Sequence, residues 1–162
     1  MKKGTLVLML SIVLSLVLSA CSSNNKEAVI DSKVPVKEMA DQILAKVEQP
    51  RLMELDAEGV KNFYHMDPAL LEEYTMRSPM MNVQTNEIAI MKVKDAKDIP
   101  TVEAAIKQRA EDVQKQFETY LPDQYENAKN YKLVTKGNYV FFVISDKADE
   151  LIKAYDSFFE QK

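Results

Sequence analysis

Few side chains in this 162-residue chain have the types and spacing that catalysis requires. His65 is the only histidine and Cys21 the only cysteine. A serine hydrolase would join His65 to a serine and an acid, and Ser78, Ser145 and Asp67 are available. No local motif, however, holds a base and a nucleophile together. We therefore expect no catalytic residue among them.

Glycine-rich motifs are also missing. Beyond residue 20 the only glycines are Gly59 and Gly137. A phosphate-binding loop needs closely spaced glycines, and a nucleophile elbow needs the pattern G-x-S-x-G. The sequence therefore excludes the common nucleotide-binding loops and the α/β-hydrolase type of nucleophile.

Two pairs of adjacent carboxylates, Glu72-Glu73 and Asp149-Glu150, resemble the acids of a glycosidase. Adjacent residues point apart on a helix or a strand, so neither pair makes a two-carboxylate site by itself. Solvent-facing charge is the simpler interpretation. An envelope hydrolase remains an alternative, provided that the fold brings more distant carboxylates together.

Methionine thioethers offer a second alternative, because they bind Cu(I) without cysteine. His65 with Met66, and Met76 with Met80 and Met81, could gather such a site. Methionine more often fills gaps in a hydrophobic core. We therefore expect no metal and no cofactor, and copper handling is the third-ranked function.

The first twenty residues have the pattern of a secretion signal. Lys2 and Lys3 precede an apolar run over residues 5–18. Fourteen helical residues span about 21 Å, which is less than the roughly 30 Å of a bilayer core. A basic start, a short apolar run and small residues after it are typical of a secretory signal rather than a membrane anchor.

Cys21 closes this segment in the sequence Leu18-Ser19-Ala20-Cys21. That sequence is similar to the lipobox of bacterial lipoproteins. The resemblance implies that the Cys21 thiol receives a diacylglyceryl group and that cleavage between Ala20 and Cys21 makes Cys21 the first residue. Two acyl chains anchor a protein stably, whereas one chain binds only marginally. Lipidation also explains a lone cysteine in a secreted chain.

Three segments follow from this pattern. We expect a signal peptide over residues 1–20, a lipidated cysteine and flexible tether over 21–34, and one globular domain over 35–162. The formal net charge is −4, and loss of Lys2 and Lys3 with the signal would leave −6. An acidic domain argues against a nucleic-acid partner. The expected location is the outer face of the cell membrane, held by the lipid.

Periodicity within the domain predicts helices and strands in alternating groups. Apolar residues at helical spacing predict helices over 36–47, 56–64, 98–120 and 146–159. Residues 72–81 and 87–94 alternate as strands, and residues 131–135 and 139–145 flank a Lys136-Gly137-Asn138 turn. Residues 140–144 are apolar on both faces, which indicates a central strand covered on both sides.

This order, α(α)ββαββα, predicts an α+β fold. We expect a four-stranded antiparallel sheet made of two β-hairpins separated by a long helix, with the N- and C-terminal helices packed on it. Tyr120, Pro122 and Tyr125 cluster where the long helix ends. Tyrosine is enriched at interfaces, so these three residues are a candidate interaction surface, although tyrosine is also often half-buried for structural reasons.

Three stretches together resemble a known family: residues 86–94 (NEIAIMKVK), 117–125 (FETYLPDQY) and 136–140 (KGNYV). They are similar to lipoproteins of Gram-positive bacteria built on domain of unknown function 4358, over roughly residues 36–159. The family is functionally uncharacterised, so the resemblance carries over no catalytic residue. The leading hypothesis is a non-catalytic module at the cell envelope that binds a protein or an envelope component.

Overall fold

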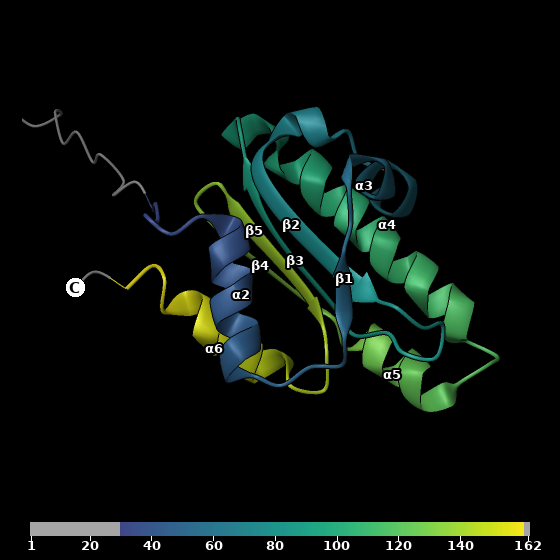
Figure 1. Ribbon diagram of the computed structural model, residues 1–162. Coiled ribbons are helices and arrows are strands. Elements are labelled where there is room, and N and C mark those ends of the chain that lie inside the picture. The colour runs from purple at the N-terminus through teal and green to yellow at the C-terminus, as the bar shows by residue number, and fades with distance from the viewer. Residues whose placement is uncertain (1–29, 161–162) are drawn as a thin grey trace, which may run out of the picture.

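A single antiparallel sheet lies between two layers of helices (Figure 1). The computed structural model describes residues 30–160. The helices are α2 (Val36–Lys46), α3 (Ala57–Tyr64), α4 (Ile99–Phe117), α5 (Pro122–Lys129) and α6 (Ala148–Asp156). The strands are β1 (Leu52–Glu54), β2 (Leu71–Pro79), β3 (Glu87–Val93), β4 (Lys132–Lys136) and β5 (Tyr139–Ile144), in the spatial order β1-β2-β3-β5-β4. The predicted α+β class is confirmed.

The predicted number of four strands is wrong, because the described residues form five. β1 adds an edge strand, pairing antiparallel with β2 so that Met53 lies opposite Ser78. Three residues are too few to display the period-two alternation from which a strand is recognised. The backbone partner in β2, not the side-chain pattern of β1, makes this segment a strand.

Both predicted hairpins are present and share the sheet, as expected. β2 pairs with β3, and β4 pairs with β5 across a turn at Gly137. Gly137 has φ +55°, a region that favours glycine. The two hairpins join through β3 and β5, where Ile90 lies opposite Phe141.

β5 is an interior strand between β3 and β4, as its double-sided apolar sequence predicted, and all six of its residues are buried. Val140 and Phe142 face the core under α3, α4 and α5, whereas Phe141 and Val143 face the core under α2 and α6. Alternate residues of a strand point to opposite faces, so each core takes every second residue. A strand of this kind needs helices on both sides.

The sequence predicted the buried face of each helix better than the residue that caps its N-terminus. The predicted helices 56–64, 98–120 and 146–159 each begin at an aspartate that could cap them. Asp56 caps α3 by accepting a hydrogen bond from the Gly59 amide at 2.8 Å. Asp98 makes no side-chain capping bond to α4. α6 begins after Lys147 with no side-chain capping bond, and the Lys147 amide donates to Ser145 Oγ at 3.0 Å in the turn before the helix. The choice among neighbouring polar residues depends on the path of the preceding chain, which periodicity does not contain.

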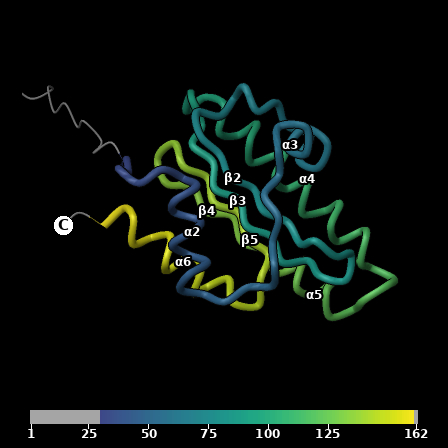
Figure 2. Tube along the Cα trace, viewed as in Figure 1, coloured from purple at the N-terminus to yellow at the C-terminus, as the bar shows by residue number. Residues whose placement is uncertain are grey.

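The first described segment lies against the β4–β5 hairpin (Figure 2). Tyr139 donates its hydroxyl hydrogen to Asp31 at 2.6 Å, and Lys92 lies 3.4 Å from the same carboxylate. The hydrogen bond from Tyr139 lowers the pKa of Asp31. A Cβ atom on Gly137 would lie only 2.8 Å from the Ile30 carbonyl oxygen. The first described residues, from 30 onward, therefore already contact the sheet, ahead of the expected domain start at 35.

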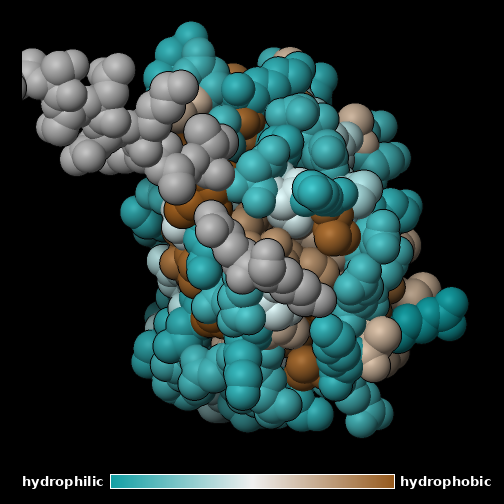
Figure 3. All heavy atoms as spheres, turned by 90° about the vertical axis from the view of Figure 1, so that its left-hand side faces the viewer, coloured by the Kyte–Doolittle hydropathy of each residue, from teal (hydrophilic) through white to brown (hydrophobic). Residues whose placement is uncertain are grey.

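The side of the molecule that carries α2 and α6 shows mostly hydrophilic residues, with hydrophobic residues in scattered patches (Figure 3). Over residues 30–160, no helix combines the length and apolar character needed to cross a membrane. The expected signal peptide, Ala20, Cys21 and most of the tether lie outside the described residues.

Candidate functional site

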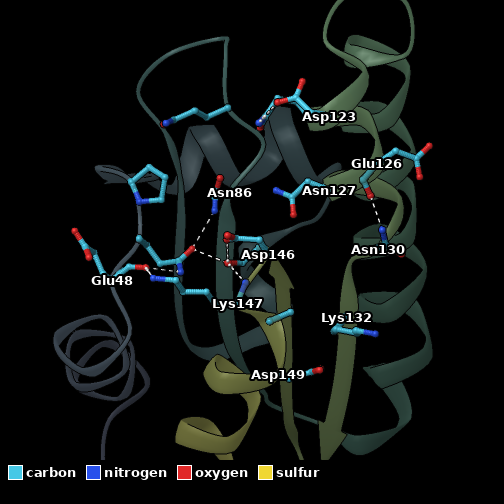
Figure 4. A pocket seen from close by; sticks show the side chains of 16 residues that line it. Glu48, Asn86, Asp123, Glu126, Asn127, Asn130, Lys132, Asp146, Lys147 and Asp149 are labelled. Carbon is cyan, nitrogen blue, oxygen red and sulfur yellow. Dashed lines mark hydrogen bonds between the residues drawn. The ribbon is translucent and has the colours of Figure 1, made fainter.

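An open cleft of about 830 Å³ lies at one end of the sheet (Figure 4). Glu87 at the start of β3 is opposite Ile144 at the end of β5, so both strands contribute flanking residues to the same end. The loop after α2 and helix α5 form the remaining walls. Four segments that are distant in sequence therefore build one cavity.

A hydrogen-bond network connects three of these segments beneath the cleft. Gln49 Oε1 accepts hydrogen bonds from Asn86 Nδ2 at 3.1 Å and from Ser145 Oγ at 2.9 Å. Asn86 and Ser145 are buried, with 8% and 5% of their surface exposed. Buried polar groups are costly unless they are paired, so this network stabilises the relative positions of the α2–β1 loop and both strand ends.

Thr85 connects the same region to α5. Its amide donates to Gln124 Oε1 at 3.0 Å, and its hydroxyl oxygen accepts from Asn127 Nδ2 at 3.0 Å. Thr85 is itself only 1% exposed. The segment before β3 is thus held on one side by Gln49 and on the other by α5, which fixes the width of the cleft.

Carboxylates outnumber cations around the cleft by five to two. The acids are Glu48, Asp123, Glu126, Asp146 and Asp149, and the bases are Lys132 and Lys147. Figure 4 shows Glu48 and Glu126 at opposite edges, with the other acids spread between them. The acids therefore surround the cleft instead of forming a close pair, and the resulting field favours neutral or cationic ligands.

A second, smaller cavity of about 250 Å³ lies between β1, the β2–β3 loop and helices α3 and α4. Met53, Phe63, Met80 and Met81 form its rim, and each is about half exposed. Methionine and aromatic side chains are common at adaptable binding surfaces. We call this cavity the methionine groove.

A buried ion pair lies at the base of the methionine groove. Arg109 donates through Nε to Glu87 Oε1 at 3.0 Å and through Nη2 to Glu87 Oε2 at 2.7 Å. The hydroxyl of Tyr64 also donates to Glu87. Burial raises the pKa of Tyr64 well above its usual value, and the negative charge of Glu87 raises it further. Three ionisable groups thus satisfy one another away from solvent.

The surface proposed from Tyr120, Pro122 and Tyr125 is divided in the structure. Tyr120 is 61% exposed beside Phe117, and Pro122 is exposed at the start of α5. Tyr125 is instead half-buried and packs against the core under α4. Its ring lies 5.1 Å from Lys129 Nζ. The three residues are therefore not equally available to a partner.

His65 ends α3 in the left-handed conformation, with φ 51°. Its Nε2 atom lies 3.0 Å from Asp112 Oδ2, a partner that the sequence did not indicate. Burial raises the pKa of Asp112, but hydrogen bonds from Gln108 and His65 outweigh it and lower the pKa. Ser145 bonds to Gln49 rather than to His65. His65 therefore pairs with Asp112 and makes no hydrogen bond to Ser78, Ser145 or Asp67, the partners considered from the sequence.

The candidate copper ligands are separated by burial. Met66 and Met76 lie in the hydrophobic core, with 4% and 0% exposed surface, whereas Met80 and Met81 are more than half exposed. Within residues 30–160, no cluster of three or more His, Cys, Asp or Glu side chains is arranged to hold a metal ion. Of the adjacent acids, Glu73 accepts from the Val36 amide at 3.0 Å, while Asp149 reaches the cleft.

Sequence reasoning missed the residues that build the cleft. Gln49, Asn86 and Gln124 appear in the sequence as ordinary loop or surface residues. The one available signal was that polar residues directly flank the two most apolar strands: Asn86 precedes β3 and Ser145 follows β5. Antiparallel pairing of those strands brings the two positions together at one end of the sheet.

The fold and the cleft define a small three-layer α+β domain with an open polar cavity at one end of its sheet. A model of the family described as domain of unknown function (DUF4358) matches residues 45–145. The chain belongs to this family, and the match includes most of the cleft and the whole methionine groove. Comparisons with curated proteins and with solved structures give no match.

Proposed function

We propose that this protein is a lipid-anchored lipoprotein on the outer face of a Gram-positive cell membrane, and that its domain binds an envelope component without catalysing a reaction. The Leu18-Ser19-Ala20-Cys21 sequence, the preceding basic and apolar segments and the absence of any other cysteine support the anchor. Membership of the DUF4358 family is consistent with this assignment.

One observation supports the binding role: the cleft and the docked N-terminal segment lie at opposite ends of the sheet. Asp31 is bound to Tyr139 at the start of β5, and the cleft begins at Ser145 just after its end. Six strand residues separate these ends by about 20 Å. Figure 1 shows the first described residues on the side of the domain away from α5.

This geometry orients the cleft if Cys21 carries the lipid. Residues 22–30 can reach at most about 32 Å from the membrane surface when fully extended. The end of the sheet that bears Asp31 and Tyr139 then faces the membrane. The cleft faces outward, where an envelope polymer or a partner is accessible.

A hydrolase is the second candidate, and the gathering of five carboxylates at one cleft favours it. Glycoside hydrolysis needs two carboxyl groups about 5–9.5 Å apart across the scissile bond. The carboxylates of the cleft surround its opening, which fits ligand attraction better than paired acid and base catalysis. Release of new reducing ends from wall glycans by the purified protein would favour the hydrolase.

The anchor is tested by replacing Cys21 with Ala and labelling growing cells with a fatty-acid analogue. We expect label on the unmodified chain and none on Cys21→Ala, because the thiol is the acceptor. Ser22→Ala is the matched control and should stay labelled. Equal labelling of all three chains would contradict the lipid anchor.

The orientation is tested separately in lipid vesicles. A fluorophore on a cysteine introduced at Lys33, near the docked segment, should be quenched by a quencher on the lipid headgroups. A fluorophore at Asp149, in the cleft, should be quenched much less. Equal quenching at both positions would contradict an outward-facing cleft.

A further inference from the structure

The first described residues, 30–34, lie against the β4–β5 hairpin as an irregular segment ahead of α2 (Figure 2). We call this segment the N-terminal strap. It ends close to a fixed point, because the Val36 amide at the start of α2 donates to Glu73 Oε2 of β2 at 3.0 Å. The strap therefore connects a firmly positioned helix to the proposed membrane anchor.

One carboxylate makes the closest contact between the strap and the sheet. Asp31 Oδ1 accepts a hydrogen bond from the Tyr139 hydroxyl at 2.6 Å and lies 3.4 Å from Lys92 Nζ. Lys92 and Tyr139 are opposite each other in the β3–β5 pairing, so two adjacent strands supply the two partners. The Tyr139 hydroxyl also lies 3.3 Å from the Ser32 carbonyl oxygen. Tyr139 thus contacts two consecutive residues of the strap.

The shape of the β4–β5 turn lets the strap lie close to it. A Cβ atom at position 137 would lie 2.8 Å from the Ile30 carbonyl oxygen, so the strap occupies space that only the absence of a side chain at Gly137 provides. At its other end, Val34 packs partly buried against the core under α2 and α6. The strap therefore has a defined position on the hairpin.

Release of the strap leaves its polar contacts with other partners. The Asp31 side chain is 57% exposed, so water solvates its carboxylate readily. Lys92 keeps Glu72 at 3.4 Å. The hydrogen bonds of the Tyr139 hydroxyl all go to the strap, so water can replace them when the strap leaves. Segments with few buried contacts open locally at a low free energy, and the strap is such a segment.

We propose that the strap is a releasable clasp that controls the orientation of the domain on the membrane. In the closed state, Asp31 holds its end of the sheet close to the anchor and the cleft faces outward. In the open state, residues 30–34 join the connection to Cys21 and add up to about 17 Å of reach, so the domain rotates about the start of α2. This proposal rests on the proposed anchor and orientation and specifies what regulates them.

Hydrogen exchange of the full chain in detergent measures the opening of the strap. Tyr139→Phe removes the hydroxyl and keeps the ring, so protection of the Val34 amide should fall about tenfold, the lower end of what a hydrogen bond to an exposed charged group contributes. Asp31→Ala should have the same effect. The double variant should add little to either, because both changes break one contact. Lys33→Ala, at an exposed position of the same strap, is the matched control and should keep the original protection.

Two outcomes of this measurement would overturn the clasp. The first is unchanged protection of the Val34 amide in both Tyr139→Phe and Asp31→Ala. The second is an equal loss of protection in β3 and β5, which would mean that these side chains stabilise the whole domain and not the strap.

Quenching in lipid vesicles tests whether the clasp controls orientation. In the lipidated chain with a fluorophore at Asp149, both Tyr139→Phe and Asp31→Ala should increase quenching by the lipid headgroups, because the cleft then reaches the membrane. Lys33→Ala should not increase it. Lower protection of the strap with unchanged quenching would show that the strap does not orient the domain, and would overturn the proposal.

Failure of the clasp is distinguishable from failure of the proposed function. The anchor fails if the unmodified chain takes up no fatty-acid label. The orientation fails if the unmodified chain is quenched equally at positions 33 and 149. The clasp alone fails if the unmodified chain is labelled and oriented while Tyr139→Phe and Asp31→Ala behave in the same way as that chain.

Discussion

The cleft and the methionine groove distribute their polar groups in opposite ways. In the cleft, charged side chains surround the opening and neutral amides form the base. In the groove, apolar side chains form the rim and the charged pair Glu87–Arg109 lies beneath them. The two cavities are separated by the segment before β3, since Asn86 belongs to one and Glu87 to the other.

This difference separates charged groups that stabilise the fold from polar groups that a ligand can reach. Glu87, Arg109 and Tyr64 satisfy one another, so their charges are committed to holding β3 against α3 and α4. Around the cleft, carboxylates and amide oxygens retain acceptor capacity toward solvent. The buried charges of the groove are thus structural, whereas the polar groups around the open cleft are within reach of a ligand.

The largest expected effect comes from breaking the buried pair of the groove. Glu87→Ala leaves Arg109 buried without its partner, which should lower the free energy of unfolding by about 3–5 kcal/mol. The measurement is urea denaturation of the purified protein. The apolar triple variant Glu87→Leu, Arg109→Met and Tyr64→Phe should recover much of the loss, because no charge is left unpaired. A loss below about 1 kcal/mol in Glu87→Ala would mean that the pair is not structural.

Breaking the hydrogen-bond network at the base of the cleft should lower stability less than breaking the buried ion pair. Gln49→Ala removes the acceptor for Asn86 and Ser145. The Asn86 amide then loses this partner and Ser145 Oγ keeps only Asp146 Oδ1 at 3.4 Å, so stability should fall by about 1–3 kcal/mol. Gln84→Ala is the matched control, because Gln84 lines the same cleft and makes no side-chain hydrogen bond among the described residues. Its effect should stay within about 0.5 kcal/mol. Equal effects of the two variants would contradict a bridging role for Gln49.

The smallest expected effect is a loss of folding stability at alkaline pH, and it tests Tyr64 beneath the methionine groove. The pKa of Tyr64 is raised in the folded protein. Above about pH 10 the unfolded chain loses this proton while the folded protein keeps it, so stability falls as pH rises, by up to about 1.4 kcal/mol per pH unit. Below that pH the group contributes its full stability.

Tyr64→Phe removes this proton and should make the decline above pH 10 shallower by the same amount. Tyr139, Tyr155 and Lys92 also have raised pKa values and contribute to the remaining slope in both proteins. The measurement is denaturant unfolding between pH 9 and 11. Identical slopes with and without the Tyr64 hydroxyl would show that burial does not hold its proton.

Much of the fold was predictable because the periodicity of apolar side chains indicates which faces of the helices and strands are buried. The two-sided apolar run of β5 identified a central strand, and the stripe of α4 from Val102 to Phe117 identified its packed face. β1 was not predictable, since three residues carry no period. The cleft was not predictable either, because Gln49, Asn86, Gln124 and Ser145 are brought together only by strand pairing and by the position of α5.

By itself, the sequence determined the order of the two hairpins and of helices α2, α3, α4 and α6, the turn at Gly137 and the acidic character of the chain, because these depend on local period, backbone preference and composition. It also provides the whole basis for the proposed anchor at Cys21. The tertiary structure decided which polar residues share a cavity and how they bond to one another. That property depends on contacts between segments distant in sequence: Asn86 and Ser145 are held together at the cleft because both donate to Gln49, which lies thirty-seven residues before Asn86.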